Sequence, residues 1–124
     1  AATMAILADT DIEQPQLYIA NPRFGKILFS DNEKKTYKYK TPIIIDDTNI
    51  YAEVKQGTYP IEKVEFYYDN KLLFTDTEKP YEYMLNKISL GFRFHKIKII
   101  AYDTRGNNAT DEIKILFLNI LKNN

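Results

Sequence analysis

GFRFHKIKIIAYDTRGNNATDEIKILF, residues 91–117, has the pattern of two long strands joined by a tight polar turn. In its first half, small or aliphatic residues at positions 97, 99 and 101 alternate with basic and then mixed residues at positions 96, 98, 100 and 102. The core-facing residues are Ile97, Ile99 and Ala101, and a period of two is typical of a strand with one face in a core. Glycine and asparagine in the turn tolerate positive φ angles, so the chain can reverse there. The alternation then resumes with Ile113, Ile115 and Phe117. A hairpin of this length needs other strands around it, so we expect it at the centre of a β-sheet.

The composition fits one compact domain with an ordinary hydrophobic core. The chain has 124 residues, of which 44% are hydrophobic and 14% aromatic, enough to form a core without metals or disulfides. Its 17 basic and 17 acidic side chains cancel, so no net charge attracts nucleic acid or an anionic membrane. The absence of cysteine excludes a disulfide framework, a thiolate nucleophile and a cysteine metal site, and it leaves the redox compartment open.

The two ends of the chain differ in character from the middle. Residues 1–14 are small, acidic and without periodicity, and Pro15 closes them, so we expect a linker or a frayed terminus. We expect one domain over residues 15–120 and a short tail over residues 121–124. No apolar run reaches the length of about 18 residues that spans a bilayer, and the first residues lack the pattern of a signal peptide. We therefore expect no direct insertion into a membrane.

Outside the hairpin, short apolar segments alternate with turn residues. The strands expected there cover residues 16–20, 26–29, 36–40, 50–54, 61–68, 71–75 and 80–85. Residues 31–35 are charged and are expected to form a loop, and residues 86–91 the loop that leads into the hairpin. About eight short strands, with turn signals about every 8 to 12 residues, favour an all-β sandwich over a small barrel. The expected core consists of Val54, Val64, Phe66, Ile97, Ile99, Ile113 and Ile115.

An ordered series of short motifs resembles the bacterial and archaeal immunoglobulin-like domains of cell-surface and secreted proteins. The motifs are IEKVEFYYDN at residues 61–70, TD at 75–76, PYEY at 80–83, Gly91, HKIKIIAYD at 95–103 and GNNA at 106–109. Their order and spacing match that family over residues 15–120. Asn70 stands where the family usually has glycine, and Phe92, Arg93 and Phe94 lengthen one segment. Neither departure conflicts with the fold.

This resemblance implies an immunoglobulin-like antiparallel β-sandwich of about seven to nine strands. It also implies a module attached to an exported hydrolase, adhesin or surface-layer protein, located outside the cell or on its surface. It implies no reaction, because folds of this kind host many functions.

Residues suited to catalysis are sparse. The serines are Ser30 and Ser89, neither in a strand-turn-helix elbow, and the single histidine is His95, so a catalytic triad is not supported. We expect His95 to be an imidazole at the edge of the core, hydrogen-bonded to a neighbouring loop. Pairs of carboxylates lie beside turns, where acidic residues are ordinary, and a sandwich of this size has little room for a deep substrate cleft. We therefore expect no enzymatic activity and no cofactor.

Oxygen-rich turns offer one candidate for calcium binding. Asp69, Asp103 and Asn107 lie in predicted turns, and carboxylate and amide oxygens are the ligands that calcium prefers. No EF-hand spacing is present, and turn formation alone also explains these residues. Asn108, in the same turn as Asp103, begins a glycosylation sequon, a tripeptide that also arises by chance.

One face of the expected sheet is the candidate binding surface. It forms if the hairpin pairs with the strand at residues 61–68, because alternate side chains then point to one face. The outward residues are Tyr67, Ile100, Tyr102 and Leu116, with Lys96 and Lys98 at one end. An apolar, aromatic patch rimmed by charge is typical of a contact with another domain or protein. The alternative is that the N-terminal residues or the loop at residues 31–41 cover this face.

Two functions remain open. The first is a non-catalytic extracytoplasmic module that acts as a spacer or interaction domain, with neighbouring domains of the parent protein or another surface protein as its partners. The second is a carbohydrate-binding accessory domain of a polysaccharide-degrading enzyme, which a flat row of exposed aromatic rings would favour. Its stacking candidates are Tyr37, Tyr39, Tyr81 and Tyr83.

Overall fold

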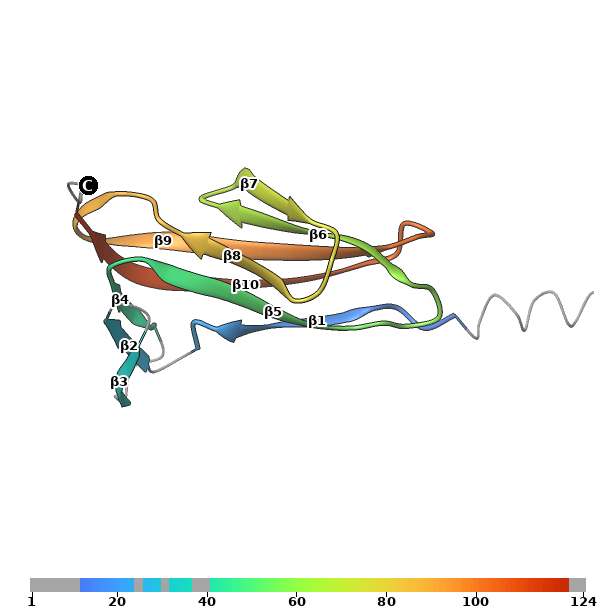
Figure 1. Ribbon diagram of the computed structural model, residues 1–124, viewed down its shortest axis with the longest axis horizontal. Helices are drawn as coiled ribbons and strands as arrows, with labels where there is room; N and C mark the ends of the chain where they lie inside the picture. The colour runs from blue at the N-terminus through green and yellow to red at the C-terminus, as the bar shows by residue number, and fades with distance from the viewer. Residues whose placement is uncertain (1–11, 24–25, 30–31, 37–40, 121–124) are drawn as a thin grey trace, which may run out of the picture.

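The computed structural model describes residues 12–23, 26–29, 32–36 and 41–120, and within them the chain forms strands and no helix. The strands are β1 (Gln16–Asn21), β2 (Lys26–Phe29), β3 (Asn32–Thr36), β4 (Ile43–Ile45), β5 (Thr48–Lys55), β6 (Ile61–Tyr68), β7 (Lys71–Asp76), β8 (Tyr81–Leu85), β9 (Ser89–Asp103) and β10 (Asn108–Asn119). One sheet has three strands, in the order β1-β5-β8, and the other has seven, in the order β3-β2-β4-β10-β9-β6-β7. The sheets lie face to face, and β9 and β10 run along most of the molecule (Figure 1). The expected all-β sandwich is confirmed, with more strands than the sequence predicts.

The β9–β10 hairpin lies inside the larger sheet and supplies much of the core. Ile97 pairs with Ile113 across it, and buried side chains follow at every second position of both strands. They are Ile97, Ile99 and Ala101 on β9 and Ile113, Ile115 and Phe117 on β10. The predicted parity is therefore confirmed. β9 begins at Ser89, within the segment predicted as a loop, because Ser89 still pairs with Asn119.

β6 pairs with β9 on one side, as predicted, and with the edge strand β7 on the other. Asp69 and Asn70 join β6 to β7 with φ angles of 49° and 70°, so this two-residue turn has the positive φ angles that the sequence predicts. Phe66 of β6 points into the core. Its ring lies 6.3 Å from that of Phe74 on β7 and 6.3 Å from that of Tyr83 on β8, measured between centroids. These rings join the two sheets.

The three-stranded sheet closes the core from the other side. Its inward residues are Ile19 of β1, Ile50 and Ala52 of β5, and Tyr81, Tyr83 and Leu85 of β8. Val54, a predicted core residue, is only partly buried. The pairing of β5 with β8 ends at Ala52, so Val54 has a neighbouring strand on one side only. The other predicted core residues are all buried.

β2, β3 and β4 extend the larger sheet at one end of the molecule (Figure 1). β4 pairs in parallel with both β10 and β2, and β3 forms the edge of the sheet. The predicted charged loop at residues 31–35 is therefore wrong for residues 32–35, which lie in β3. Pairing with β2 decides the structure here, and lysine is common on edge strands because it discourages pairing with other chains. The sequence also predicts a strand at residues 36–40. Thr36 is the last residue of β3, and residues 37–40 lie outside the described residues.

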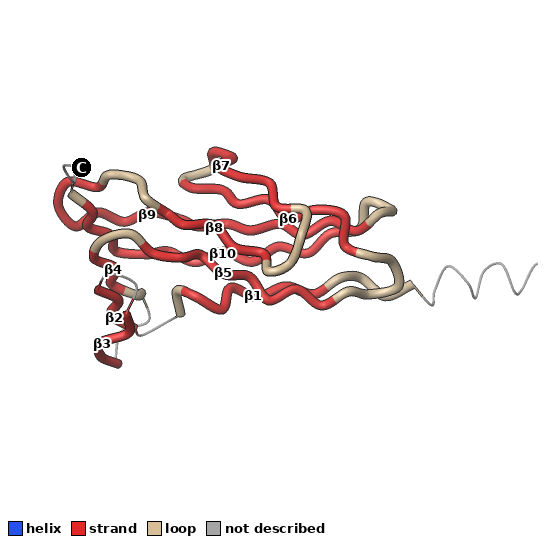
Figure 2. Tube along the Cα trace, in the orientation of Figure 1, coloured by secondary structure: helices blue, strands red, loops and turns tan. Residues whose placement is uncertain are grey.

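The residues before β1 run beside the loop at residues 56–60, at the end of the molecule away from the β2–β3 hairpin (Figure 2). Thr58 N–H donates to the Glu13 carbonyl over 3.0 Å, and Glu13 N–H donates to Thr58 Oγ1 over 2.6 Å. Gly57 permits this approach, because a Cβ there would lie 2.6 Å from the Gln14 carbonyl oxygen. Glu13 is thus hydrogen-bonded to the sandwich, although the sequence places it in the linker.

Candidate functional site

A serine, a histidine and an aspartate meet where the β6–β7 turn lies against β9. His95 Nδ1 lies 2.6 Å from Asp69 Oδ2, and His95 Nε2 lies 3.2 Å from Ser89 Oγ. His95 thus contacts a neighbouring loop, as the sequence predicts. The sequence does not predict that the serine and the aspartate join it, because the strand register that brings them together is not visible in one sequence.

The position of Ser89 is unsuited to nucleophilic attack. Ser89 is only 3% exposed, and its hydroxyl donates to the Phe117 carbonyl over 2.9 Å. A nucleophilic serine needs an open approach for the substrate and hydrogen-bond donors for the oxyanion. The Gly91 carbonyl, 3.3 Å from Ser89 Oγ, is a second acceptor rather than a donor. The serine therefore connects β9 to β10 instead of facing solvent.

Asp69 fastens the β6–β7 turn to β9. Its Oδ1 accepts a hydrogen bond from Lys96 N–H over 2.9 Å, and its own N–H donates to the Lys96 carbonyl, also over 2.9 Å. Desolvation alone raises the pKa of the Asp69 carboxyl, but the hydrogen bonds from His95 and Lys96 and their charges outweigh it and lower the pKa below its usual value. The cluster of Ser89, His95 and Asp69 thus holds strands together.

His95 also packs between aromatic rings. Its ring stacks on Tyr68 at 4.8 Å between centroids with an interplanar angle of 21°, and it meets the Phe117 ring edge-on at 6.1 Å. Burial raises the pKa of Tyr68 to about 12, with a further contribution from the Asp69 carboxylate. The Tyr68 hydroxyl has no hydrogen-bond partner among the described residues. Tyr68 therefore stays a neutral phenol at physiological pH.

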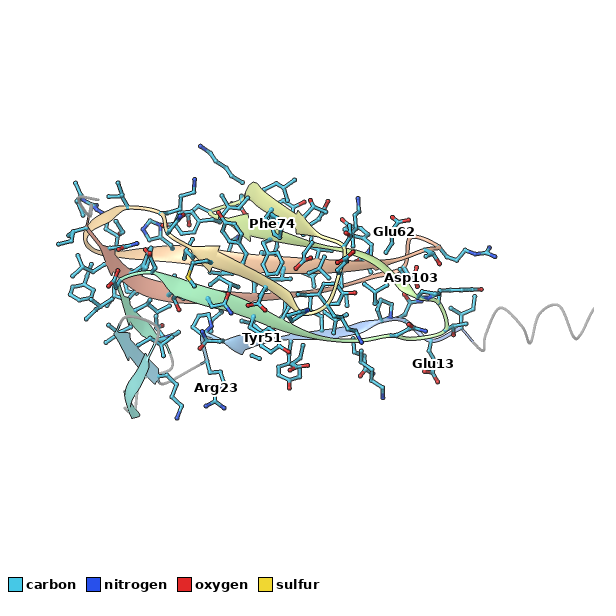
Figure 3. All side chains as sticks on the ribbon, viewed as in Figure 1. Glu13, Arg23, Tyr51, Glu62, Phe74 and Asp103 are labelled. Atoms are coloured by element: carbon cyan, nitrogen blue, oxygen red, sulfur yellow. The ribbon has the colours of Figure 1, made fainter. Side chains whose placement is uncertain are left out.

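Asp103, whose side chain is buried, organises the β9–β10 turn, at the end of the hairpin away from the start of β9 and the end of β10 (Figure 3). Its Oδ1 accepts hydrogen bonds from Arg105 N–H and Asn107 N–H, each over 2.9 Å. Burial alone raises the pKa of the Asp103 carboxyl. The hydrogen bonds from Asn107, Arg105 and Gly106 outweigh burial and hold this pKa below its usual value.

We expect the fold to lose stability in acid and Asp103 to account for part of the loss. A carboxyl with a lowered pKa in the folded state stabilises the fold above its unfolded pKa of about 3.9 and loses that contribution as the pH falls through the folded pKa. Asp103→Asn should therefore be less stable than the wild type at about pH 7, and should lose less stability between about pH 5 and about pH 2. Melting temperature against pH measures both. If the melting temperatures of the two proteins fell in parallel with pH, a group other than Asp103 would account for the loss.

The three residues predicted to bind calcium do not meet at one site. Asp69 lies beside Lys96, whereas Asp103 and Asn107 lie in the other turn, which contacts Pro60. Asp103 Oδ2 accepts a hydrogen bond from Asn107 Nδ2 over 2.9 Å, so the two residues bind each other. In the part of the chain that the structure describes, no three His, Cys, Asp or Glu side chains gather closely enough to hold a metal ion. Turn formation accounts for these residues.

The predicted binding face is the outer face of β6 and β9, and charged residues lie between its aromatic ones. The cross-strand pairs are Lys63 with Tyr102, Glu65 with Ile100, and Lys98 with Tyr67. Lys98 Nζ lies 5.2 Å from the Tyr67 ring centroid and Lys63 Nζ lies 5.1 Å from that of Tyr102, so both rings contact a cation. Tyr67, Ile100 and Tyr102 thus share a face without being direct partners. Of the two lysines predicted at one end of the face, Lys98 lies opposite Tyr67, and Lys96 lies beyond the last β6–β9 pair.

Leu116, the fourth predicted residue of that face, lies in a separate apolar area at one end of the larger sheet. It pairs with Phe94 of β9 on one side and with Ile43 of β4 on the other. Ser89 and Asn119 pair with each other and are buried, so the residues that flank them point outward. We name this surface the end patch. It comprises Ile43, Ile45, Ile88, Leu90, Phe92, Phe94, Leu116, Leu118 and Ile120.

The tyrosines predicted to stack on sugar do not form an exposed row. Tyr81 is buried, and Tyr83 stacks on Phe74 between the two sheets at 5.5 Å between centroids. Tyr37 and Tyr39 lie outside the described residues. For Tyr81 and Tyr83 the prediction is wrong, because their side of β8 packs on the core.

Two other tyrosines, Tyr18 of β1 and Tyr51 of β5, point away from the core. The sequence contains the signal for both. Ile50 and Ala52 alternate inward on β5, so Tyr51 between them must point outward, and Tyr18 precedes the buried Ile19. Figure 3 labels Tyr51 on β5, beside β1.

Two solved structures share the arrangement of these sheets. One, of the fibronectin(III)-like modules of CbhA from Clostridium thermocellum, aligns with a TM-score of 0.62 and 21% identity over 90% of this chain and 50% of that chain. The other, of SGBP-B from the mixed-linkage glucan utilization locus of Bacteroides ovatus in complex with a mixed-linkage heptasaccharide, aligns with a TM-score of 0.51 and 16% identity over 90% of this chain and 26% of that chain. The fold is immunoglobulin-like. The chain spans half of the chain in the first structure and about a quarter of the chain in the second.

Comparisons of the sequence with protein families and curated proteins do not assign the chain to a family. No protein-family model matches the chain, and neither does any curated protein. Among the described residues, the structure contains no helix of the length and apolar character needed to cross a membrane.

Proposed function

We propose that the chain is a non-catalytic immunoglobulin-like module of a larger extracytoplasmic protein, and that it docks onto a neighbouring protein domain through the end patch. The observation that carries the proposal is the exposure of the patch. Leu90, Phe94 and Ile120 leave 66%, 62% and 62% of their surface in solvent. Single exposed apolar residues are ordinary, whereas a contiguous group marks an interaction site.

The strand register makes the patch contiguous. Phe94, Leu116 and Ile43 are direct neighbours across β9, β10 and β4. Neighbouring strands lie about 4.8 Å apart, so their side chains form one surface. Phe92 and Leu118 continue this surface along the same strands. A flat apolar area of this kind matches the centre of a protein interface, where water is excluded.

Charged groups lie at the margin of the patch. Lys114 Nζ lies 5.3 Å from the Phe94 ring centroid, and Arg93 Nε donates to the Leu90 carbonyl over 3.4 Å. A polar rim around an apolar centre is typical of contacts between folded domains. The two aromatic rings, Phe92 and Phe94, are the side chains expected to contribute most of the binding energy.

Two further observations support a module without catalytic activity. Ser89 is buried although it lies beside His95, so the one serine-histidine pair among the described residues has no access to a substrate. Two solved structures with the same fold are of fibronectin(III)-like modules and of a protein with a bound heptasaccharide. Both support an accessory role, and with it a location outside the cell or on its surface.

The experiment compares the isolated chain with the complete product of its gene. Amide hydrogen exchange should be slower in the complete product at residues 88–94 and 114–120, because docking excludes water from the end patch. Phe92→Ser with Phe94→Ser should remove this protection and leave the melting temperature of the isolated chain nearly unchanged. Both rings are exposed, at 49% and 62%, so the fold does not depend on them.

A matched control removes two exposed apolar side chains elsewhere. Leu72→Ser with Met84→Ser changes residues that are 51% and 47% exposed and lie outside the end patch, so protection should persist. Equal exchange over the patch in the isolated chain and the complete product would contradict the proposal. Loss of protection with Tyr67→Ser and Tyr102→Ser, but not with the phenylalanine changes, would instead assign docking to the outer face of β6 and β9.

A further inference from the structure

The outer face of the three-stranded sheet combines exposed aromatic rings with carboxylates. Tyr18 on β1 lies directly opposite Glu53 on β5, and Tyr51 on β5 lies directly opposite Glu82 on β8. These four residues alternate with the inward residues of the same strands, so they share one face. Polar and aromatic groups therefore interleave across three neighbouring strands.

The two rings are diagonal neighbours on this face. Tyr18 is 60% exposed and is the most open tyrosine ring of this face. Tyr51 is two residues from Glu53, so it is the diagonal neighbour of Tyr18, at about 7 to 8 Å between Cα atoms. A hydrogen bond to Glu53, followed by the charge of Glu53 and burial, raises the pKa of the Tyr51 phenol.

Hollows lie on both sides of Glu53. One, of about 330 Å³, is lined by Gln16, Leu17, Tyr18, Glu53, Val54 and Lys55. The other, of about 350 Å³, is lined by Tyr51, Ala52, Glu53, Val54, Lys79, Pro80 and Tyr81. Both hollows include Glu53 and Val54, so they adjoin each other at β5, and we call the two together the track. Each has the size of a small-ligand site, about 300 Å³ or more, but the sheet gives it a flat floor.

We infer that this track binds a neutral, β-linked glucan chain. A β-linked glucose unit carries its hydroxyl groups around the rim of the ring and presents C–H groups on both faces. The C–H face can pack on an aromatic ring, as Tyr18 and Tyr51 offer, while rim hydroxyls donate to carboxylates. Glu82 is oriented for this by Asn49 Nδ2, which donates to its Oε1 over 2.9 Å.

The charges of the face select against acidic polysaccharides. Glu53 lines both hollows, and Glu82 lies opposite Tyr51 on the neighbouring strand, so the two carboxylates would repel a uronate. Lys55 and Lys79 lie toward its margins, where they can donate to hydroxyl oxygens. The flat floor suits an extended chain better than a single sugar, because a lone ring would be covered on one side only.

This site is independent of the end patch, which lies on the other sheet. A module can therefore dock onto a neighbouring domain and bind a glucan at the same time. Failure of either proposal leaves the other standing, since the two rest on different residues and different measurements.

The test is native electrophoresis of the chain in gels that contain soluble mixed-linkage β-glucan, followed by titration calorimetry with cellohexaose. The wild type should be retarded by the glucan and not by polygalacturonate. Tyr18→Ala should weaken cellohexaose binding by about tenfold or more, the loss of one ring contact, whereas Tyr18→Phe should retain it. Equal melting temperatures would show that the variants are folded.

Tyr59→Ala is the matched control. Tyr59 lies in the loop between β5 and β6, where Arg105 covers its ring at 5.1 Å, so its removal should not change the retardation. The inference is overturned if the wild type binds neither the β-glucan nor cellohexaose at millimolar concentration. It is also overturned if Tyr18→Ala binds as well as the wild type, if Tyr59→Ala loses binding equally, or if polygalacturonate retards the wild type more than the glucan does.

Discussion

Ile99→Ala should lower the free energy of unfolding by about 2 to 5 kcal/mol, the range for removing a buried isoleucine side chain down to alanine. Ile99 is fully buried in β9 and pairs with Phe66 of β6 on one side and with Asp111 of β10 on the other. Because strands fix its backbone on both sides, the structure can collapse little around the cavity. Urea denaturation, with a slope unchanged from the wild type, measures the loss.

Ile100→Ala is the matched control, since it removes the same atoms one residue further along β9. Ile100 points to the outer face, opposite Glu65 and Thr110, and is only partly buried. Its loss should stay below about 1 kcal/mol, as for most changes outside the core. Equal losses at residues 99 and 100 would show that the outer face is covered in solution. A loss below about 0.5 kcal/mol for Ile99→Ala would mean that the parity of β9 is inverted.

The sequence predicts the centre of the fold because the signals there are local. Ile97, Ile99 and Ala101 alternate without interruption, and the turn that follows contains residues that tolerate its backbone geometry. Alternation reports which side of a strand faces the core, whatever its partner is. The same holds for β6 and for the turn at Asp69 and Asn70.

Strand partners and register are harder to predict from the sequence, because they depend on contacts between distant segments. Nothing local in β3 predicts a strand, and pairing with β2 decides it. The outer face of β6 and β9 shows the same limit. Alternation places Tyr67 and Ile100 on one face, but the register puts Lys98 opposite Tyr67, and a shift between Ile61 and Lys63 contributes to that register.

The candidate sites follow this division. The cluster of Ser89, His95 and Asp69 depends on register and could not be predicted from composition or spacing. The outward direction of Tyr18 and Tyr51 depends on alternation alone, so it could have been predicted from the sequence. The end patch lies between these cases. Its phenylalanines directly follow residues 86–91, which the sequence predicts as a loop, and pairing with β10 extends β9 back to Ser89 within that segment.

Phe66→Ala should be the more damaging of the two core changes, at about 3 to 5 kcal/mol, the range for removing a buried phenylalanine ring. Phe66 is nearly fully buried, and its ring contacts Phe74 and Tyr83, which belong to different sheets. Removing it therefore opens a cavity between the sheets and also ends two ring contacts worth about 0.5 to 1.5 kcal/mol each beyond their buried area.

Phe74→Ala separates the ring contacts from the cavity. Phe74 stacks on Tyr83 and contacts Phe66, but it lies on the edge strand β7 and is 40% exposed, so water can fill the space it leaves. Its loss should therefore be smaller than that of Phe66→Ala by about 1 kcal/mol or more, since a filled space carries no cavity cost. Denaturation of both variants under one set of conditions gives the difference. If Phe74→Ala is as damaging as Phe66→Ala, the contact between the sheets depends on the edge strand, and the core extends to β7.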